Sequence, residues 1–256
     1  MFRGVRHWST VRDQTRAPYT SFTAALSATQ AMRASRPVPP AIAADDAIEV
    51  LFSDKHLVCL SKPTGLLSVP GHASSDNLKS RVRARPRFNT AEPVHRLDKC
   101  TSGVMLMALD AQSCSALGRQ FAQRTVRKRY IAIVDGVLDR DSGRIALPIR
   151  ATANHRPLRA IADVGEPGAK ACATTWQVVA RSAGSTRVLL SPTTGRSHQL
   201  RLHMAAIGHP IIGDVMYAIE ETTLAKSQRL LLHASELTVA HPASNVTMAF
   251  RAPCPF

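Results

Sequence analysis

The sequence predicts an α+β fold built on a mixed, mostly antiparallel central sheet. Short apolar segments of strand length greatly outnumber helical ones, and they rarely alternate with helices. The 256 residues, 45% of them hydrophobic, suffice for one large domain or two small ones. No apolar run approaches the roughly 18–20 residues that a bilayer-spanning helix needs, so we expect no membrane segment.

Strands are predicted where apolar runs of suitable length lie between turn residues. The first two candidates flank a turn at residues 53–55, and two later ones flank a turn at residues 183–185. In chain order the predicted strands are residues 48–52, 56–60, 103–109, 126–136, 144–149, 173–180, 186–191, 230–241 and 246–250.

Three helices are predicted. One begins at Asp76 and ends before Pro86, because the residue before a proline disfavours helical geometry. A second spans residues 111–124, with an apolar stripe at Ala111, Cys114, Leu117 and Phe121. Ser197 is expected to cap a third helix, whose apolar stripe is Leu200, Met204 and Ile207.

The chain is strongly basic, with 33 Lys and Arg against 18 Asp and Glu and a net charge of +15. This excess indicates a polyanionic partner, either nucleic acid or an anionic membrane surface. The sequence has no amphipathic basic helix with an aromatic face, which favours nucleic acid. Residues 76–87 hold a basic run that is expected either to contact phosphates or to form a solvated face: Lys79, Arg81, Arg83, Arg85 and Arg87.

The first 46 residues differ in composition from the rest. Residues 1–40 hold six arginines and one acid, Asp13, so +5 of the charge lies there and 15 − 5 = +10 on the remainder. We predict that residues 1–46 are a disordered basic extension and that residues 47–256 form the domain. An organelle transit peptide and a flexible RNA-contacting arm are the alternatives.

Five cysteines are present, an odd number without any C-x-x-C pair. Neither a disulfide framework nor a zinc knuckle is expected, and a reducing cytoplasm fits this composition. His198, His203 and His209 have no cysteine or carboxylate at ligand spacing. We therefore expect neither a metal nor a cofactor.

The string from His95 to Gly103, His-Arg-Leu-Asp-Lys-Cys-Thr-Ser-Gly, precedes the apolar run at residues 104–108. In an extended chain Arg96 and Asp98 point to the same side, and a neighbouring cation keeps a carboxylate ionised in a cleft. By itself the pair is equally compatible with a surface salt bridge followed by a turn.

The longer string resembles the signature of the RluA-type pseudouridine synthases. Further matches are Lys62-Pro63 with Gly65, the alternating pattern from Lys128 to Gly136, and the segment from Thr193 to His203. The segments 208–214 and 230–242 also resemble the family, as does Tyr217. Lys99-Cys100 departs from the more common residues at these positions. No separate N-terminal RNA-binding domain is expected.

The resemblance implies a sheet split around an RNA-binding cleft and an enzyme that isomerises uridine to pseudouridine without a cofactor. Asp98 is then the catalytic carboxylate, attacking the sugar, attacking the base or removing a ribose proton. Arg201 is its ion-pair partner, and Tyr130 stacks on the extruded uracil and helps to remove the C5 proton. The expected RNA-binding residues are Arg96, which enters the RNA stack, and Lys128, Arg196 and His198.

The implied substrates are stem-loops of large-subunit rRNA, the tRNA anticodon arm, or both, bound by a monomer.

Two other classes of protein are the alternatives. A non-catalytic RNA-binding ribosome-assembly factor with the same fold predicts loss of Asp98, Tyr130 or Arg201, and all three are present. A basic protein that coats nucleic acid predicts dispersed charge without a strict aspartate motif.

Overall fold

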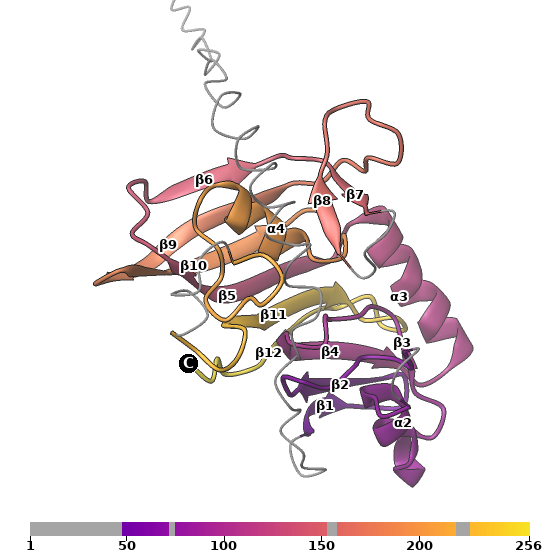
Figure 1. Cartoon of the computed structure of the whole chain (residues 1–256). Helices are drawn as coiled ribbons and strands as arrows, with labels where there is room; N and C mark the ends of the chain where they lie inside the picture. The colour runs from indigo at the N-terminus through magenta and orange to yellow at the C-terminus, as the bar shows by residue number, and fades with distance from the viewer. Residues whose placement is uncertain (1–47, 72–74, 153–157, 219–225) are drawn as a thin grey trace, which may run out of the picture.

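The computed structural model describes residues 48–71, 75–152, 158–218 and 226–256, so the prediction for residues 1–46 lies outside the described part. A ten-stranded sheet forms the frame, in the order β1-β2-β4-β11-β5-β10-β9-β6, with β3 paired to β4 and β12 to β11 (Figure 1). Strands β7 and β8 form a separate pair. The strands are β1 Glu49–Ser53, β2 Leu57–Lys62, β3 Glu92–Pro93, β4 Ser102–Ala108, β5 Arg127–Asp135, β6 Ser142–Ile145, β7 Ile149–Ala151, β8 Arg159–Ile161, β9 Thr174–Ser182, β10 Ser185–Pro192, β11 Leu232–Ala240 and β12 Thr247–Arg251.

Two halves of the sheet meet at the β4–β11 junction. Among the described strands this is the one parallel pairing, and it extends over only two residue pairs, His233 with Ser102 and Ala234 with Gly103. Gly103 has φ +115°, and a Cβ there would overlap the backbone of Ala234. Only glycine allows this approach. The predicted mixed, mostly antiparallel sheet is confirmed.

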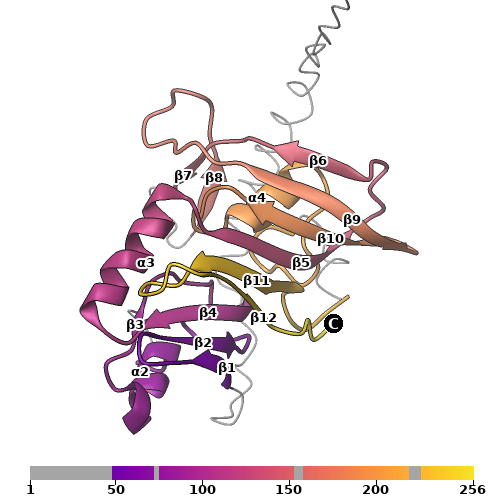
Figure 2. The ribbon, with the colours of Figure 1, turned by 180° about the vertical axis from the view of Figure 1, so that it is seen from behind.

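The helices are α2 Leu78–Arg83, the 3-10 turn η2 Pro86–Phe88, α3 Ala111–Gln123 and α4 Gln199–Ala206. Helix α3 lies beside β4 and β11, as Figure 2 shows from behind. The Asp110 side chain caps α3 by accepting the Ser113 N–H at 2.7 Å, and Leu117 is fully buried. Arg124 ends α3 in the left-handed conformation, which confirms the helix predicted for residues 111–124.

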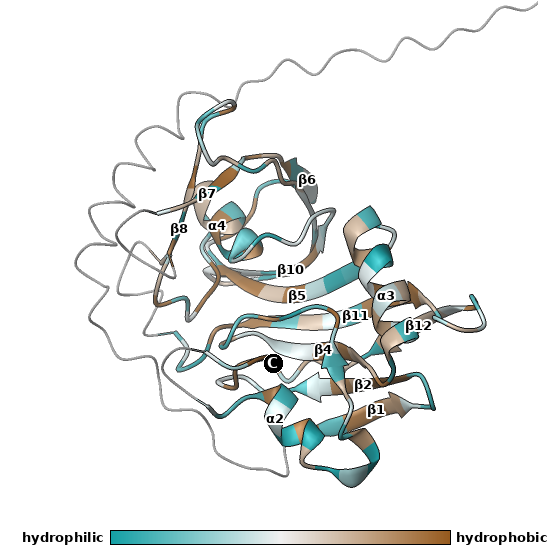
Figure 3. Cartoon of the chain, turned by 90° about the vertical axis from the view of Figure 1, so that its right-hand side faces the viewer, coloured by the Kyte–Doolittle hydropathy of each residue, from teal (hydrophilic) through white to brown (hydrophobic). Residues whose placement is uncertain are grey.

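Helix α4 lies in a hollow of the sheet. The strands β5, β10 and β6 and the pair β7–β8 curve around it in Figure 3, and all eight of its residues are buried. Leu200, Met204 and Ile207 pack on the core of β5 and β10, which confirms the predicted apolar stripe. Because its polar residues are buried too, α4 is a structural element of the interior and not an exposed basic helix.

Two local predictions are wrong. Ser197 does not cap α4; the N-cap is His198, in the left-handed conformation with φ 59° and no side-chain capping bond. The strand predicted for residues 144–149 is interrupted, since β6 ends at Ile145 and β7 begins at Ile149. Pro148 lies in the interruption and has no N–H to donate to a ladder.

Candidate active site

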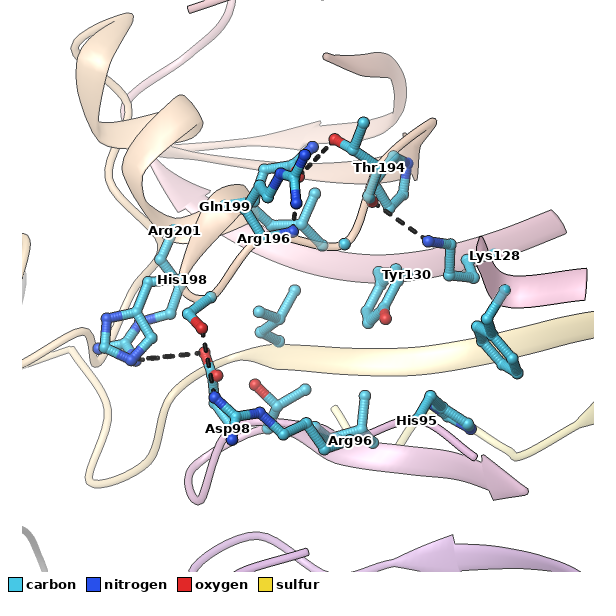
Figure 4. A pocket seen from close by; sticks show the side chains of 18 of the residues that line it. His95, Arg96, Asp98, Lys128, Tyr130, Thr194, Arg196, His198, Gln199 and Arg201 are labelled. Atoms are coloured by element: carbon cyan, nitrogen blue, oxygen red, sulfur yellow. Dashed lines mark hydrogen bonds and ion pairs between the residues drawn. The ribbon is translucent and has the colours of Figure 1, made fainter. Parts of the chain in front are cut away.

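A pocket of about 450 Å³ lies over β5 and β11. One wall is the segment that leads into β4, the other is the segment that joins β10 to α4, and the end of α3 closes one side (Figure 4). The volume falls within the range of small-molecule sites. All seven residues predicted from the sequence line this pocket: Arg96, Asp98, Lys128, Tyr130, Arg196, His198 and Arg201.

Asp98 lies on a loop whose backbone is hydrogen-bonded to residues 62–68. The Thr101 N–H donates to the Asp98 carbonyl at 3.0 Å, which closes a turn. The Gly65 N–H donates to the Lys99 carbonyl at 2.8 Å, and the Thr64 hydroxyl donates to the Cys100 carbonyl at 2.8 Å. The loop is therefore fixed by backbone contacts, while the Asp98 side chain retains 28% of its exposure.

Lys62 anchors this support from within the protein. Its side chain is 1% exposed, and its Nζ donates to the carbonyls of Pro63, Leu66 and Lys99 at 2.8, 2.7 and 3.2 Å. Burial lowers the pKa of Lys62 to about 7. The Lys-Pro-x-Gly motif thus shapes the loop that carries Asp98, a role that its sequence match alone did not reveal.

Arg201 of α4 lies between two carboxylates. Its Nε and Nη2 donate to Asp214 Oδ2 and Oδ1 at 2.7 and 2.6 Å, and its Nη1 lies 3.5 Å from Asp98 Oδ2. Burial opposes the charge of Arg201, but Asp214 and Asp98 hold its pKa above the ordinary value. Burial also opposes the charge of Asp214, yet Arg201 and two backbone N–H groups keep the pKa of that carboxyl low. The planar two-point contact of Arg201 is therefore made with Asp214, and the ion pair expected with Asp98 is formed through Nη1 alone.

His198 lies on the same side of Asp98. Its Nε2 is 4.0 Å from Asp98 Oδ2, and its Nδ1 is 2.6 Å from the Tyr217 hydroxyl. That hydroxyl also accepts the Arg159 N–H at 3.0 Å, which fixes its position beside the His198 ring. Burial and the Arg201 charge lower the pKa of His198 to about 4, so the ring is neutral at pH 7.

Tyr130 rises from β5 into the pocket. Its strand neighbours are Leu190 on β10 and Ala234 on β11, so its backbone is fixed on both sides. Figure 4 shows the ring between the Thr194 segment and the loop of Asp98. Burial, with a smaller effect of Asp98, raises the pKa of Tyr130, so the phenol is neutral at pH 7. An aromatic face is thereby presented inside a polar pocket.

Three further cations border the pocket. Lys128 donates to the Thr194 carbonyl at 3.2 Å, and Arg96 reaches across the opening to the Ser197 hydroxyl at 3.4 Å. The Arg196 Nε is buried and has no hydrogen-bond partner among the described residues. Three positive charges around one pocket suit it to an anionic ligand.

The segment that carries Arg196 and His198 is fixed by Gln199. Its Oε1 accepts the Thr194 hydroxyl at 2.7 Å and the Arg196 N–H at 3.1 Å. Its Nε2 donates to the Ala173 carbonyl at 3.0 Å and to the Thr174 hydroxyl at 3.1 Å. Gln199 therefore fixes the segment that precedes α4, although neither it nor Ser197 caps the helix.

The basic run of residues 76–87 does not reach the pocket. Arg81 pairs with Asp76 at 2.7 Å, and Lys79 and Arg83 pair with Glu92 at 2.8 and 3.0 Å. None of its five basic residues lines the pocket.

Within residues 48–71, 75–152, 158–218 and 226–256, no helix has the length and apolarity to cross a membrane. The same residues contain no cluster of three metal-ligating side chains.

The sequence of the chain was compared with known families and curated proteins. Residues 56–206 match the RNA pseudouridylate synthase family, and the chain belongs to this family. It is accordingly an isomerase that converts uridines of RNA to pseudouridine. The dual-specificity RNA pseudouridine synthase RluA of Yersinia pestis is 47% identical over 208 residues, 81% of this chain and 99% of that protein. The RluA of Escherichia coli K12 is 43% identical over 209 residues, 81% and 93% of the two chains.

Solved structures agree with the fold. Human RNA pseudouridylate synthase domain containing 1 superposes with a TM-score of 0.71 at 26% identity, covering 84% of this chain and 86% of that one. Human RNA pseudouridylate synthase domain containing 4 gives a TM-score of 0.65 at 24% identity, covering 93% and 94%. The second likeness bears on the fold alone.

Proposed function

We propose that Asp98 is the catalytic carboxylate of this isomerase and that its substrates are stem-loops of large-subunit rRNA and the tRNA anticodon arm. The observation that carries the first part is the position of Asp98: it is partly exposed in a cationic pocket, with the buried Arg201 3.5 Å away. The buried cation thus faces this carboxylate without enclosing it. The dual specificity of the RluA relatives supports the second part.

The substrate uridine leaves its RNA stack to reach Asp98. Tyr130 provides a neutral ring on which the uracil stacks, and Arg96 at the pocket opening enters the space that the base vacates. Lys128, Arg196 and His198 line the same pocket and hold the flanking RNA backbone. Removal of the C5 proton by Tyr130 requires its phenol to lose a proton first, so stacking is the role that its raised pKa favours.

The test is Asp98→Asn, which keeps the shape of the side chain and removes its charge. Pseudouridine formation on a minimal stem-loop should be abolished, while RNA affinity stays close to wild type because the phosphate contacts remain. Asp141→Asn is the matched control, since Asp141 is 88% exposed and pairs with Arg181 outside the pocket. Product formation by Asp98→Asn within about tenfold of wild type would contradict the assignment.

Pseudouridine mapping of total RNA with and without the protein tests the substrates. Loss of pseudouridine at one rRNA stem-loop and one anticodon arm is the expected result. A change in rRNA alone or tRNA alone would refute dual specificity and leave the role of Asp98 intact.

A further inference from the structure

Asp214 is a fully buried carboxylate at the back of the active site, and four donors fix its position. Besides Arg201 Nε and Nη2, the N–H groups of Met216 and Tyr217 donate to its Oδ1 at 2.9 and 3.2 Å. The preceding Gly213 has φ 78°, and a Cβ there would overlap the Arg229 carbonyl. The backbone therefore holds this carboxylate in one place.

The contact with Asp214 orients Arg201. A guanidinium is planar, so fixing Nε and Nη2 on one carboxylate also fixes the direction of Nη1. The guanidinium carbon additionally lies 5.1 Å from the centre of the Tyr217 ring, which limits rotation of the plane. Only Nη1 is left to face Asp98, at 3.5 Å.

The arrangement also divides the charge of Arg201. One positive charge is shared between two carboxylates, and the shorter, two-point contact belongs to Asp214. Asp98 is faced by a single arginine nitrogen and keeps lone pairs that no donor among the described residues occupies. An arginine free to turn would contact Asp98 with two nitrogens, and the carboxylate would lose reactivity toward the substrate.

We propose that Asp214 is a positioning residue of the isomerisation: it holds Arg201 edge-on and takes up part of its charge, so that Arg201 faces Asp98 through Nη1 alone and leaves that carboxylate unencumbered. This inference rests on the proposed catalytic role of Asp98. The titratable and charged groups that interact electrostatically with Asp98 are Lys62, Cys100, Tyr130, His198, Arg201 and Tyr217.

The test is Asp214→Asn, measured as single-turnover pseudouridine formation across pH. Asparagine retains an acceptor for Met216 and Tyr217 but loses the charge and one bond to Arg201. We expect the rate at neutral pH to fall by about 10- to 100-fold, because the reacting groups are misplaced. The acid limb of the pH profile should move to lower pH, because the undivided charge of Arg201 stabilises ionised Asp98. RNA affinity should stay within about threefold.

Asp54→Asn is the matched control. Asp54 likewise accepts two backbone N–H groups, from His56 and Leu57, and pairs with a side chain, His241, but it does not line the pocket. Its variant should match wild type in rate and acid limb. Asp214→Glu, which keeps the charge but displaces the carboxylate, should lower the rate and leave the acid limb in place.

A wild-type rate for Asp214→Asn, or a lower rate with an unmoved acid limb, would overturn the proposal. If Asp214→Asn does not fold, Asp214→Glu decides: a wild-type rate in that variant refutes the positioning role. Asp98→Asn separates this result from the proposed function. An active Asp98→Asn overturns both, whereas an inactive Asp98→Asn beside a wild-type Asp214→Asn overturns only the role of Asp214.

Discussion

Replacing Arg201 by alanine should destabilise the protein far more than loss of an ordinary surface ion pair. The side chains of Arg201 and Asp214 are 4% and 0% exposed and joined by two bonds of 2.6 and 2.7 Å. Removing one partner of a buried pair leaves the other charge uncompensated, at a cost of about 3–5 kcal/mol. That is a large fraction of the roughly 5–15 kcal/mol by which a domain is stable.

Urea unfolding followed by circular dichroism measures this loss. With an m-value of about 2–3 kcal/mol/M for a chain of this size, the midpoint of Arg201→Ala should fall by about 1–2.5 M. Arg251→Ala is the control, since Arg251 pairs with Glu236 at 2.8 Å but is 72% exposed. The control should lose no more than about 1 kcal/mol.

The pH dependence has a definite sign. In the wild type the low pKa of Asp214 contributes stability above the unfolded pKa, about 3.9, and this is lost as pH falls through the folded value. Without Arg201 burial raises that pKa, so ionised Asp214 destabilises the fold at neutral pH and protonation relieves the penalty in acid. The difference in the free energy of unfolding between Arg201→Ala and wild type should therefore shrink as pH is lowered toward 4.

A double variant separates stability from chemistry. In Arg201→Met with Asp214→Asn the buried charges are gone, and the asparagine still accepts the backbone N–H groups of Met216 and Tyr217. We expect this double variant to regain most of the stability that Arg201→Ala loses and to form no pseudouridine.

A loss below about 1 kcal/mol in the free energy of unfolding of Arg201→Ala would show that the pair behaves as if exposed and would refute the reasoning.

Three further predictions concern other parts of the chain. Gly103→Ala, whose Cβ would overlap Ala234, should cost at least about 1–3 kcal/mol in urea unfolding, whereas Gly118→Ala, in an open helical position, should cost nothing; equal stability of the two would contradict this. Burial lowers the pKa of His95 to about 3, so the stability that its neutral form contributes is present at and above pH 6.5 and is lost in acid. His95→Gln should therefore flatten the fall in the free energy of unfolding between pH 7 and pH 4.5. An unchanged slope would count against this role of His95. Deleting residues 1–40 should preserve turnover on a minimal stem-loop, because a charge of +10 remains; a large loss at moderate salt would assign the extension to RNA binding.

The fold was predictable where local pattern decides structure. The apolar runs between turn residues became β2, β5, β10 and β11, and the 3.6-residue stripe at Leu117 became α3. Failures occurred where contacts distant in sequence decide. Gln199 organises the start of α4 by bonding to Ala173 and Thr174, and no signal near Ser197 indicates this. Likewise, Glu92 forms ion pairs with Lys79 and Arg83 of the basic run, because the chain folds back around η2.

The site was predictable only by family resemblance. No spacing argument brings Asp98 and Arg201 together across 103 residues, because they come from opposite walls of the pocket. Asp214 was part of a matched string, yet the string does not show that its carboxylate turns inward. That direction depends on Gly213 lying against Arg229, a contact between two segments.

The separation of Asp98 and Arg201 is set by a third segment, which touches both walls. Arg229 donates to the Ser102 hydroxyl at 2.7 Å, directly behind the loop of Asp98, while its carbonyl lies against Gly213, directly before Asp214. Ser102 is also bonded to His233 at 2.9 Å, at the two-pair junction of β4 and β11. The Thr-Ser-Gly end of the aspartate motif therefore belongs to the joint between the sheet halves. A carboxylate and an arginine on different halves can keep a 3.5 Å separation only if that joint is rigid, so the motif supplies the proposed catalytic carboxylate together with the contacts that hold it in register.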